Sequence, residues 1–293
     1  MGTSSWSFPG WEGIVYDGRH AQTRLAREGL EAYAAHPLLG AVGVDRTYYQ
    51  PISADDFRRY AEVVPDDFRF LVKAERLLTS PLDPDAFGVR EPNERFLDPR
   101  YATEEVVGPM MEGLGDRAGP LLFQFSPIPP NLVGGRDRFI ERLYHFLHAL
   151  PDGLLYAVEL RTPAFLTERY ARMLEAVGAA HCYNVHPSMT PLDRQLSVVS
   201  PFDQPALVVR WLLRADLKYE AARERYAPFD EIVDEDLPSR ERIAVAVLDA
   251  LVAERPALVI VGNKAEGSAP RSVLRLAERI AHWKPSEEKT DVS

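Results

Sequence analysis

Short apolar runs alternate with amphipathic segments along the whole chain, and this alternation restricts the possible folds more than any other feature. The amphipathic segments repeat apolar residues every three or four positions, as helices do; examples are TRLAREGLEAYAAH, SADDFRRYAEVV, RFIERLYHFLHAL and ERYARMLEAV. Eight apolar runs have the length and composition of buried strands: GTSSW (2–6), GAVGVD (40–45), FRFLVKA (68–74), PLLFQF (120–125), LLYAVEL (154–160), AAHCYNV (179–185), ALVVRWL (206–212) and ALVIVGN (257–263).

Strands that alternate with helices form parallel sheets. Eight of them favour closure into an α/β barrel over an open, doubly wound sheet. No G-x-G-x-x-G motif follows any of the runs, so the main signal for a dinucleotide-binding open sheet is missing. We therefore predict a single (β/α)8 TIM-barrel-like domain over residues 1–283, followed by a disordered tail over 284–293.

Two long connections interrupt the regular alternation. Residues 77–101 are rich in proline and aspartate and follow the third run, and residues 214–238 are charged, contain tyrosines and follow the seventh. Long irregular connections in compact domains tend to be lids or binding loops. We expect both to lie over the carboxyl ends of the strands, where barrel active sites are found.

Composition limits the partners of the chain. The formal net charge is −10 and the pI about 5.3, which argues against a surface built to hold nucleic acid or an anionic membrane. Cys182 is the only cysteine, so no intrachain disulfide can form and a reducing compartment is compatible. The first residues lack the pattern of a secretory signal, and no apolar run approaches the ~20 residues of a membrane-spanning helix. These features predict a cytoplasmic protein whose oligomeric state is open.

Polar and aromatic residues stand where the strands end. In the stretch LLYAVELRTPAF (154–165), Glu159 and Arg161 are two positions apart, so they point to the same side of a strand, ~6.6 Å apart along it. They either line a pocket at the barrel mouth or form an ion pair that holds the rim. The residues at the other strand ends are Trp6, Asp45, Lys73, Gln124, Asn184, His186, Arg210, Asn263 and Lys264.

The charges of this set predict an anionic ligand, such as a phosphate or a carboxylate, because four cations face two carboxylates. We expect Asp45 or Glu159 to transfer a proton. In GNKAEGSAPRS, Gly267 and Ser268 stand at a helix start whose free N–H groups suit an anion, although Ser268 with Pro270 is also an ordinary cap. The residues expected to bind substrate are Lys73, Arg161, Arg210, Asn263, Lys264, Trp6 and Tyr48.

Other chemistries fit less well. Asp45, Glu159 and His186 are the only plausible metal ligands, and no closely spaced histidine pair supports them, so we expect neither metal nor cofactor. Glu159 among cations stays ionised, which makes it a poor general acid for a glycosidase. Cys182 lies inside a strand and is expected to be a small core residue.

Several motifs together resemble, in order, the YecE-like family (domain of unknown function 72), over residues 2 to about 282. The resemblance implies a TIM-barrel fold and a pocket at the strand ends, but no reaction. It is imperfect: Gly43 and Asp45 stand where the family has glutamate and asparagine, and Leu212 and Leu213 replace a His-Gly pair. The motifs are GTSSWSFPGWEGIVY, RTYY, FRFLVKAERLLTSP, GPLLFQFSP, AVELRTPAF and NKAEGSAPRSVLRLA.

Three functional hypotheses remain open at this point. The first is a barrel enzyme that acts on a small anionic or sugar-like metabolite. The second is a non-catalytic ligand-binding or scaffold barrel, which the missing acid–base groups favour. The third is a phosphodiester-cleaving or nucleic-acid-binding barrel, which similar folds permit and which the acidic charge and the poor metal set oppose.

Overall fold

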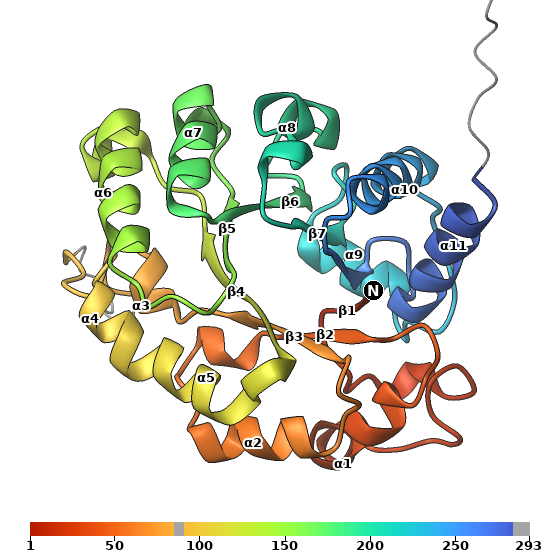
Figure 1. Ribbon diagram of the computed structural model, residues 1–293. Helices are drawn as coiled ribbons and strands as arrows, with labels where there is room; N and C mark the ends of the chain where they lie inside the picture. Colours follow the sequence, from red (N-terminus) through yellow and green to blue (C-terminus); the bar gives the residue numbers. More distant parts are fainter. Residues whose placement is uncertain (85–90, 284–293) are drawn as a thin grey trace, which may run out of the picture.

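The computed structural model describes residues 1–84 and 91–283. Eight parallel strands follow one another around a closed barrel in chain order, and helices surround it (Figure 1). The last strand pairs with the first, with Gly2 opposite Ile260, which closes the ring. The predicted α/β barrel is therefore confirmed. The strands are β1 Gly2–Thr3, β2 Ala41–Val44, β3 Arg69–Lys73, β4 Ala118–Phe125, β5 Tyr156–Leu160, β6 Ala180–Val185, β7 Leu207–Leu213 and β8 Ala257–Lys264.

The amphipathic segments form the outer helices. Ser53 caps α2 by accepting a hydrogen bond from the backbone N–H of Asp56, which ends the preceding loop and starts the helix. The helices are α1 Gln22–Ala34, α2 Ala54–Glu62, α3 Arg76–Thr79, α4 Pro99–Tyr101, α5 Gly108–Leu114, α6 Arg136–His148, α7 Glu168–Val177, α8 Leu192–Val198, α9 Tyr219–Tyr226, α10 Leu237–Val252 and α11 Ala269–Ala281.

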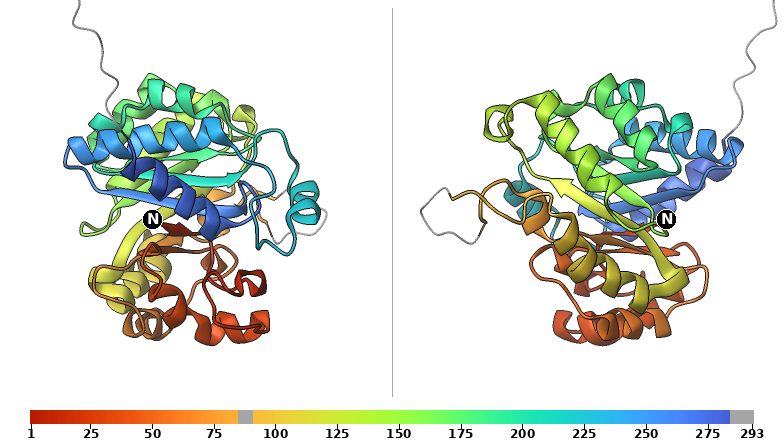
Figure 2. Two further views of the ribbon diagram at one scale, coloured as in Figure 1. Left: turned by 90° about the vertical axis from the view of Figure 1, so that its right-hand side faces the viewer. Right: turned by 60° about the vertical axis from the view of Figure 1, so that its left-hand side comes forward.

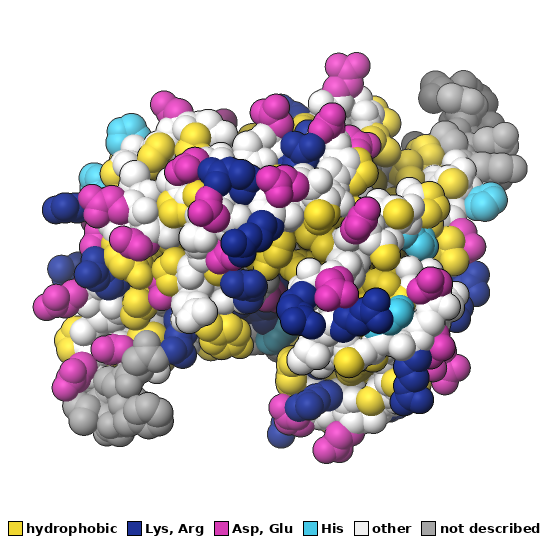
Figure 3. Space-filling view, turned by 90° about the horizontal axis from the view of Figure 1, so that it is seen from below, with side chains coloured by type: hydrophobic (Ala, Val, Ile, Leu, Met, Phe, Trp, Pro, Cys, Tyr) yellow, Lys and Arg dark blue, Asp and Glu magenta, His cyan; other side chains and the backbone are white. Residues whose placement is uncertain are grey.

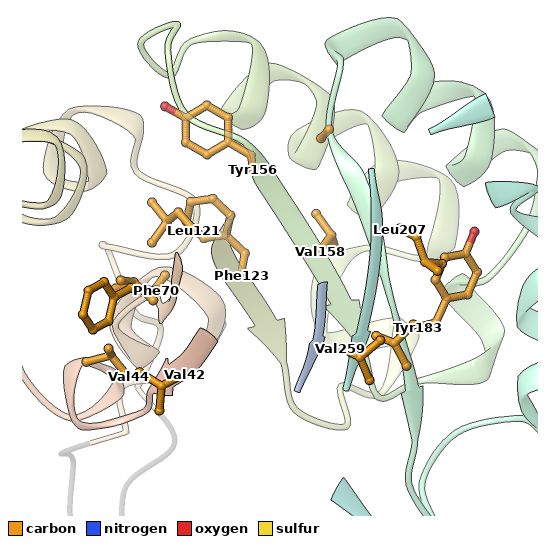
Figure 4. Packing of buried hydrophobic residues seen from close by; sticks show 14 of the residues in the cluster. Val42, Val44, Phe70, Leu121, Phe123, Tyr156, Val158, Tyr183, Leu207 and Val259 are labelled. Atoms are coloured by element: carbon orange, nitrogen blue, oxygen red, sulfur yellow. The ribbon is translucent and has the colours of Figure 1, made fainter. Parts of the chain in front are cut away.

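Small and medium apolar side chains fill the interior of the barrel. Successive residues of a strand face opposite sides, so each strand contributes alternate residues to this interior. The outward residues, among them Val42, Phe123 and Val158, belong to a larger buried cluster that includes apolar residues of the surrounding helices (Figure 4). The interior cluster consists of Ala41, Leu71, Leu122, Ala157, Ala180, Cys182, Val208 and Ile260, so Cys182 is a core residue as expected.

The same alternation places polar residues above this interior cluster. Two positions beyond Ala157 comes Glu159, and two beyond Val208 comes Arg210, on the same inward side. The interior is therefore apolar at the amino ends of the strands and charged at their carboxyl ends.

The two long connections differ in structure. Residues 214–238 contain α9, which projects beyond one end of the barrel (Figure 2). Residues 77–101 contain the end of α3, an isolated antiparallel bridge between Leu82 and Pro92, and α4. Positions 85–90 of this connection, and the tail at 284–293, lie outside the described residues. Nothing in the described part of the chain is a helix long and apolar enough to cross a membrane.

His181 gives the barrel wall a pH dependence. It is fully buried on β6, and its Nδ1 lies 3.0 Å from the hydroxyl of Tyr170 on α7. Burial lowers the pKa of His181 to about 4, so the folded chain keeps the ring neutral where an unfolded chain binds a proton. We expect the free energy of unfolding to fall as the pH drops from about 6.5 to 4, by up to about 1.4 kcal/mol per pH unit.

Urea unfolding at several pH values checks this expectation. His181→Gln removes the titrating group and should make the decline between pH 6.5 and 4 shallower than in the wild type. An unchanged slope in the variant would show that His181 does not cause the decline.

Candidate functional site

A cavity of about 380 Å³ opens at the carboxyl ends of the strands. It gathers side chains from strand ends far apart in the sequence, as expected for a barrel mouth. Five of the residues expected to bind substrate line it together with Asp45, namely Lys73, Arg161, Arg210, Asn263 and Lys264. Its lining consists of Ser4, Ser5, Phe8, Asp45, Lys73, Gln124, Arg161, His186, Arg210, Leu212, Leu213, Tyr219, Gly262, Asn263 and Lys264.

Glu159 is completely buried and does not itself line the cavity, whereas its partners Arg161 and Arg210 do. One of its carboxylate oxygens accepts a hydrogen bond from Nε of Arg161, and the other accepts one from Arg210 at 2.7 Å. Burial alone would raise the pKa of Glu159, but the charges of Arg161 and Arg210 outweigh it and lower the pKa to about 2. Of the two alternatives left open for Glu159 and Arg161, the ion pair is present, and Arg161 also lines the cavity.

Arg210 connects opposite sides of the barrel. Its side chain is 3% exposed; besides Glu159 on β5, it donates to both carboxylate oxygens of Asp45, which follows β2, at 3.2 and 3.4 Å. The Asp45 side chain remains 42% exposed. Asp45 is therefore the more accessible of the two carboxylates, while both oxygens of Glu159 are occupied.

Arg161 and Lys73 both line the cavity and have few partners for their charged groups. Arg161 donates to Glu159 through Nε. For its two terminal nitrogens, the described part of the chain shows no hydrogen-bond acceptor. The Lys73 ammonium lies 3.5 Å from the centre of the Tyr48 ring, and among the described residues no carboxylate pairs with it. These two cations are thus available to a ligand.

The remaining wall combines amide, imidazole and ammonium groups. The side-chain oxygen of Asn263 accepts hydrogen bonds from the indole N–H of Trp11 and from the backbone N–H of Ala269. His186 is half-buried; burial and the charge of Arg161 lower its pKa to about 4, so its ring is neutral near pH 7. The Lys264 ammonium lies 4.1 Å from the centre of the Tyr219 ring on α9.

Trp6, one of the residues expected to bind substrate, does not line the cavity. Strand β1 ends at Thr3 rather than at residue 6, so Ser4 and Ser5 occupy the strand-end positions that line the cavity. Trp6 is buried against α1 instead, where its indole N–H donates to the backbone oxygen of Leu25 at 3.1 Å. An early end to a two-residue strand changes which side chain faces the interior, and the sequence pattern did not reveal it.

The predicted anion-binding loop, Gly267 and Ser268, packs against other parts of the chain. Gly267 and Ser268 are buried, and neither lines the cavity. The N–H of Gly267 donates to the backbone oxygen of Asn263 at 2.9 Å, and the backbone of Glu231 and Val233 covers the glycine closely. This helix start is therefore occupied by the chain itself, and Ser268 is the residue that precedes α11.

Tyr48 stands at the border of the cavity and does not line it. It supports Lys73 from one side and lines a neighbouring hollow with residues such as Ser80, Leu82 and Ser126. No described residue of 77–101 lines the main cavity, whereas Tyr219 of 214–238 does. A lid function for either segment stays a prediction.

Sequence reasoning missed part of the wall. Ser4, Ser5 and Tyr219 were not among the expected site residues, and Gln124 and His186 were noted only as strand-end residues. The serines could have been found only from the true length of β1. Within residues 1–84 and 91–283, no group of three His, Cys, Asp or Glu side chains is arranged to hold a metal ion.

Comparisons with known proteins agree with this architecture. A family model described as "Protein of unknown function DUF72" matches residues 1–291. The UPF0759 protein YecE of Escherichia coli K12 is 28% identical over 168 residues, which are 57% of this chain and 50% of that protein. The chain thus spans about half the length of the curated relatives that it matches.

Solved structures of the same family share the fold. A DUF72 family protein from Thermotoga maritima superposes with a TM-score of 0.66 at 20% identity, over 96% of this chain and 98% of that one. One from Enterococcus faecalis V583 superposes with a TM-score of 0.64 at 18% identity, over 97% and 95%. At these identities the likeness concerns the fold alone. With the family model matched from residue 1 to residue 291, the chain belongs to the DUF72 family.

Proposed function

We propose that the strand-end cavity binds a small anionic metabolite bearing a carboxylate or a phosphate, and that the protein is an enzyme acting on it. The observation that carries this proposal is the pair of free cations, Arg161 and Lys73, that face one cavity. Arg161 offers a planar pair of donors, which match the two oxygens of a carboxylate or phosphate. A ligand of this kind supplies the acceptors that the described residues do not.

The charge balance of the cavity supports the same ligand class. Glu159 and Asp45 are balanced by Arg161 and Arg210, so the surplus positive charge comes from Lys73 and Lys264. His186 adds no charge near pH 7 because its pKa is about 4. A concave site with surplus positive charge attracts anions even in a protein whose net charge is −10.

Asp45 is the better candidate for proton transfer. A general acid or base must reach the ligand. Glu159 is completely buried and both its oxygens accept hydrogen bonds from arginines. Asp45 lines the cavity and is partly exposed, so we assign the proton-transfer role to it.

The two alternatives are less well supported. A purely ligand-binding barrel would use Arg161 and Lys73 in the same way but would not need Asp45. A nucleic-acid-binding barrel needs a continuous basic surface. On the face drawn in Figure 3, basic and acidic side chains are interspersed, which does not favour such a surface.

Replacing Arg161 tests the proposal directly. Arg161→Ala removes the free donor pair, and we expect anion affinity to fall by about 10- to 150-fold, or roughly 1.5–3 kcal/mol. Arg161→Lys should restore only part of the affinity because an ammonium lacks the planar pair of donors. The measurement is calorimetric titration with inorganic phosphate and with glycerol phosphate. Arg59→Ala, which removes a 75%-exposed arginine of α2, is the matched control; equal losses in both variants would contradict the proposal.

Arg210 should affect stability more than Arg161 does. Arg210→Ala leaves buried Glu159 with one partner and Asp45 without its arginine, so we expect a loss of about 3–5 kcal/mol in the free energy of unfolding. Arg161→Ala keeps the Arg210 contact and should cost less. Urea unfolding measures both, and the Glu159→Gln/Arg210→Met double variant should recover part of the loss because the fully buried side chain at position 159 is no longer charged. A loss no larger than that of Arg59→Ala would show that the buried pair is not needed for stability.

Anion binding should also weaken above about pH 8. Burial lowers the pKa of Lys73 to about 8, with Asp45 and Glu159 opposing this shift and Arg210 and Arg161 adding to it. Deprotonation removes one cation from the cavity, so by linkage the affinity should decline as the pH rises through about 8, by at most tenfold per unit.

Sulfate is the suitable probe for this pH dependence, because its own charge is constant over the range. Calorimetric titrations between pH 6.5 and 9.5 should show the decline in the wild type and a weaker, pH-independent affinity in Lys73→Met. A pH-independent affinity in the wild type would remove Lys73 from the binding site.

A further inference from the structure

The chain uses lysine sparingly, and two of its few lysines line the cavity. Of the 34 basic residues, only five are lysines: Lys73, Lys218, Lys264, Lys284 and Lys289. An arginine keeps its charge under all ordinary conditions, whereas a lysine can lose its proton and become a nucleophilic amine. A lysine placed at the cavity of an arginine-rich chain therefore adds a reactivity that arginine cannot supply.

Lys73 has the surroundings of a reactive amine. Its side chain is 9% exposed, and its Nζ faces the cavity at the end of β3. Among the described residues no hydrogen-bond acceptor or ion-pair partner for this nitrogen is found, and its contact is with the face of the Tyr48 ring. Desolvation is the main cause that disfavours the charged form of Lys73, and it is a feature that activates lysine nucleophiles. Arg210 and Arg161 act in the same direction, whereas Asp45 and Glu159 oppose it.

Lys264 lacks these features. It is only partly buried, and its ammonium lies between two aromatic rings, 4.1 Å from the centre of Tyr219 and 5.8 Å from that of Phe229. Lys73 also contacts an aromatic face, that of Tyr48, so the difference between the two lysines lies in burial: Lys73 is buried and Lys264 is not.

We propose that Lys73 forms an imine with the carbonyl carbon of an anionic substrate, namely a 2-oxo acid or a phosphorylated ketone. The inference rests on the proposed anion binding, because Arg161 would hold the anionic group while Lys73 attacks the nearby carbonyl. Both substrate classes carry a ketone within a few bonds of an anionic group.

Imine formation by Lys73 needs neither an oxidant nor a metal. The lone pair of the neutral amine forms the C–N bond, and the electron pair of the C=O double bond moves to oxygen, which takes up a proton. One proton leaves the nitrogen through Asp45 or water, giving a carbinolamine. Protonation of its hydroxyl and loss of water then form the C=N bond. The protonated imine withdraws electrons from the adjacent carbon, which is the chemistry of aldol cleavage and decarboxylation.

Reductive trapping tests the imine. The wild type is incubated with pyruvate or with dihydroxyacetone phosphate in the presence of sodium cyanoborohydride, which converts an imine into a stable secondary amine, and each lysine peptide is then quantified by mass spectrometry. Burial sets the pKa of Lys73 at about 8, so at pH 7 its labelling should exceed that of an ordinary lysine by about 100-fold. The substrate that labels Lys73 more strongly, pyruvate or dihydroxyacetone phosphate, shows whether the site prefers a carboxylate or a phosphate.

Two variants make the result specific. Lys73→Arg keeps the positive charge and removes the amine, so the preferential labelling should disappear while sulfate still binds. Lys218→Arg removes an exposed lysine outside the cavity and should leave labelling of Lys73 unchanged. Sulfate should compete with labelling in the wild type.

The outcomes separate this inference from the proposed function. Sulfate binding together with labelling spread evenly over the lysines would overturn the imine and leave the anion site in place. Preferential labelling of Lys73 by neutral acetone as strongly as by pyruvate would support the imine and contradict anion recognition. Neither sulfate binding nor preferential labelling would overturn both.

Discussion

The buried carboxylate of Glu159 is the constraint on which the candidate site depends. A charge without solvent exposure must be paired, and each of its oxygens is paired with a different arginine. This requirement fixes Arg161 and Arg210 by their contacts with Glu159, and Arg210 in turn holds Asp45 on the opposite side of the barrel. One buried negative charge thus orders three strand ends and sets the positions of the groups that face the ligand.

The arrangement separates structural from functional charges. Both oxygens of Glu159 and most of Arg210 are used inside the protein, so their role is to organise the site. Arg161 has a dual position, with Nε on Glu159 and its terminal nitrogens toward the cavity. Lys73 has no such internal partner among the described residues, so its charge and its proton remain available for chemistry. Whether a charged residue organises the site or can contact a ligand is thus decided by its contacts rather than by its residue type.

Two glycines let neighbouring backbone segments approach closely near the site. Gly43 on β2 has the backbone of Ser4 beside it, and a side chain there would meet that backbone at 3.2 Å. Gly262 on β8 lines the cavity, and a side chain there would approach the backbone oxygen of Leu212 to 2.9 Å. Glycine at these two positions therefore avoids a clash with neighbouring backbone.

The sequence by itself determined the barrel and placed Glu159 and Arg161 on the same side of one strand. Strand–helix alternation and the two-residue period of a strand are local properties, so they can be read from the chain. The sequence could not place Trp6, because the end of β1 depends on its neighbours, nor reveal that the chain itself covers Gly267. It also did not indicate that Arg210 bridges Glu159 and Asp45. Only the tertiary structure decided these points, because they depend on which distant segments meet when the barrel closes.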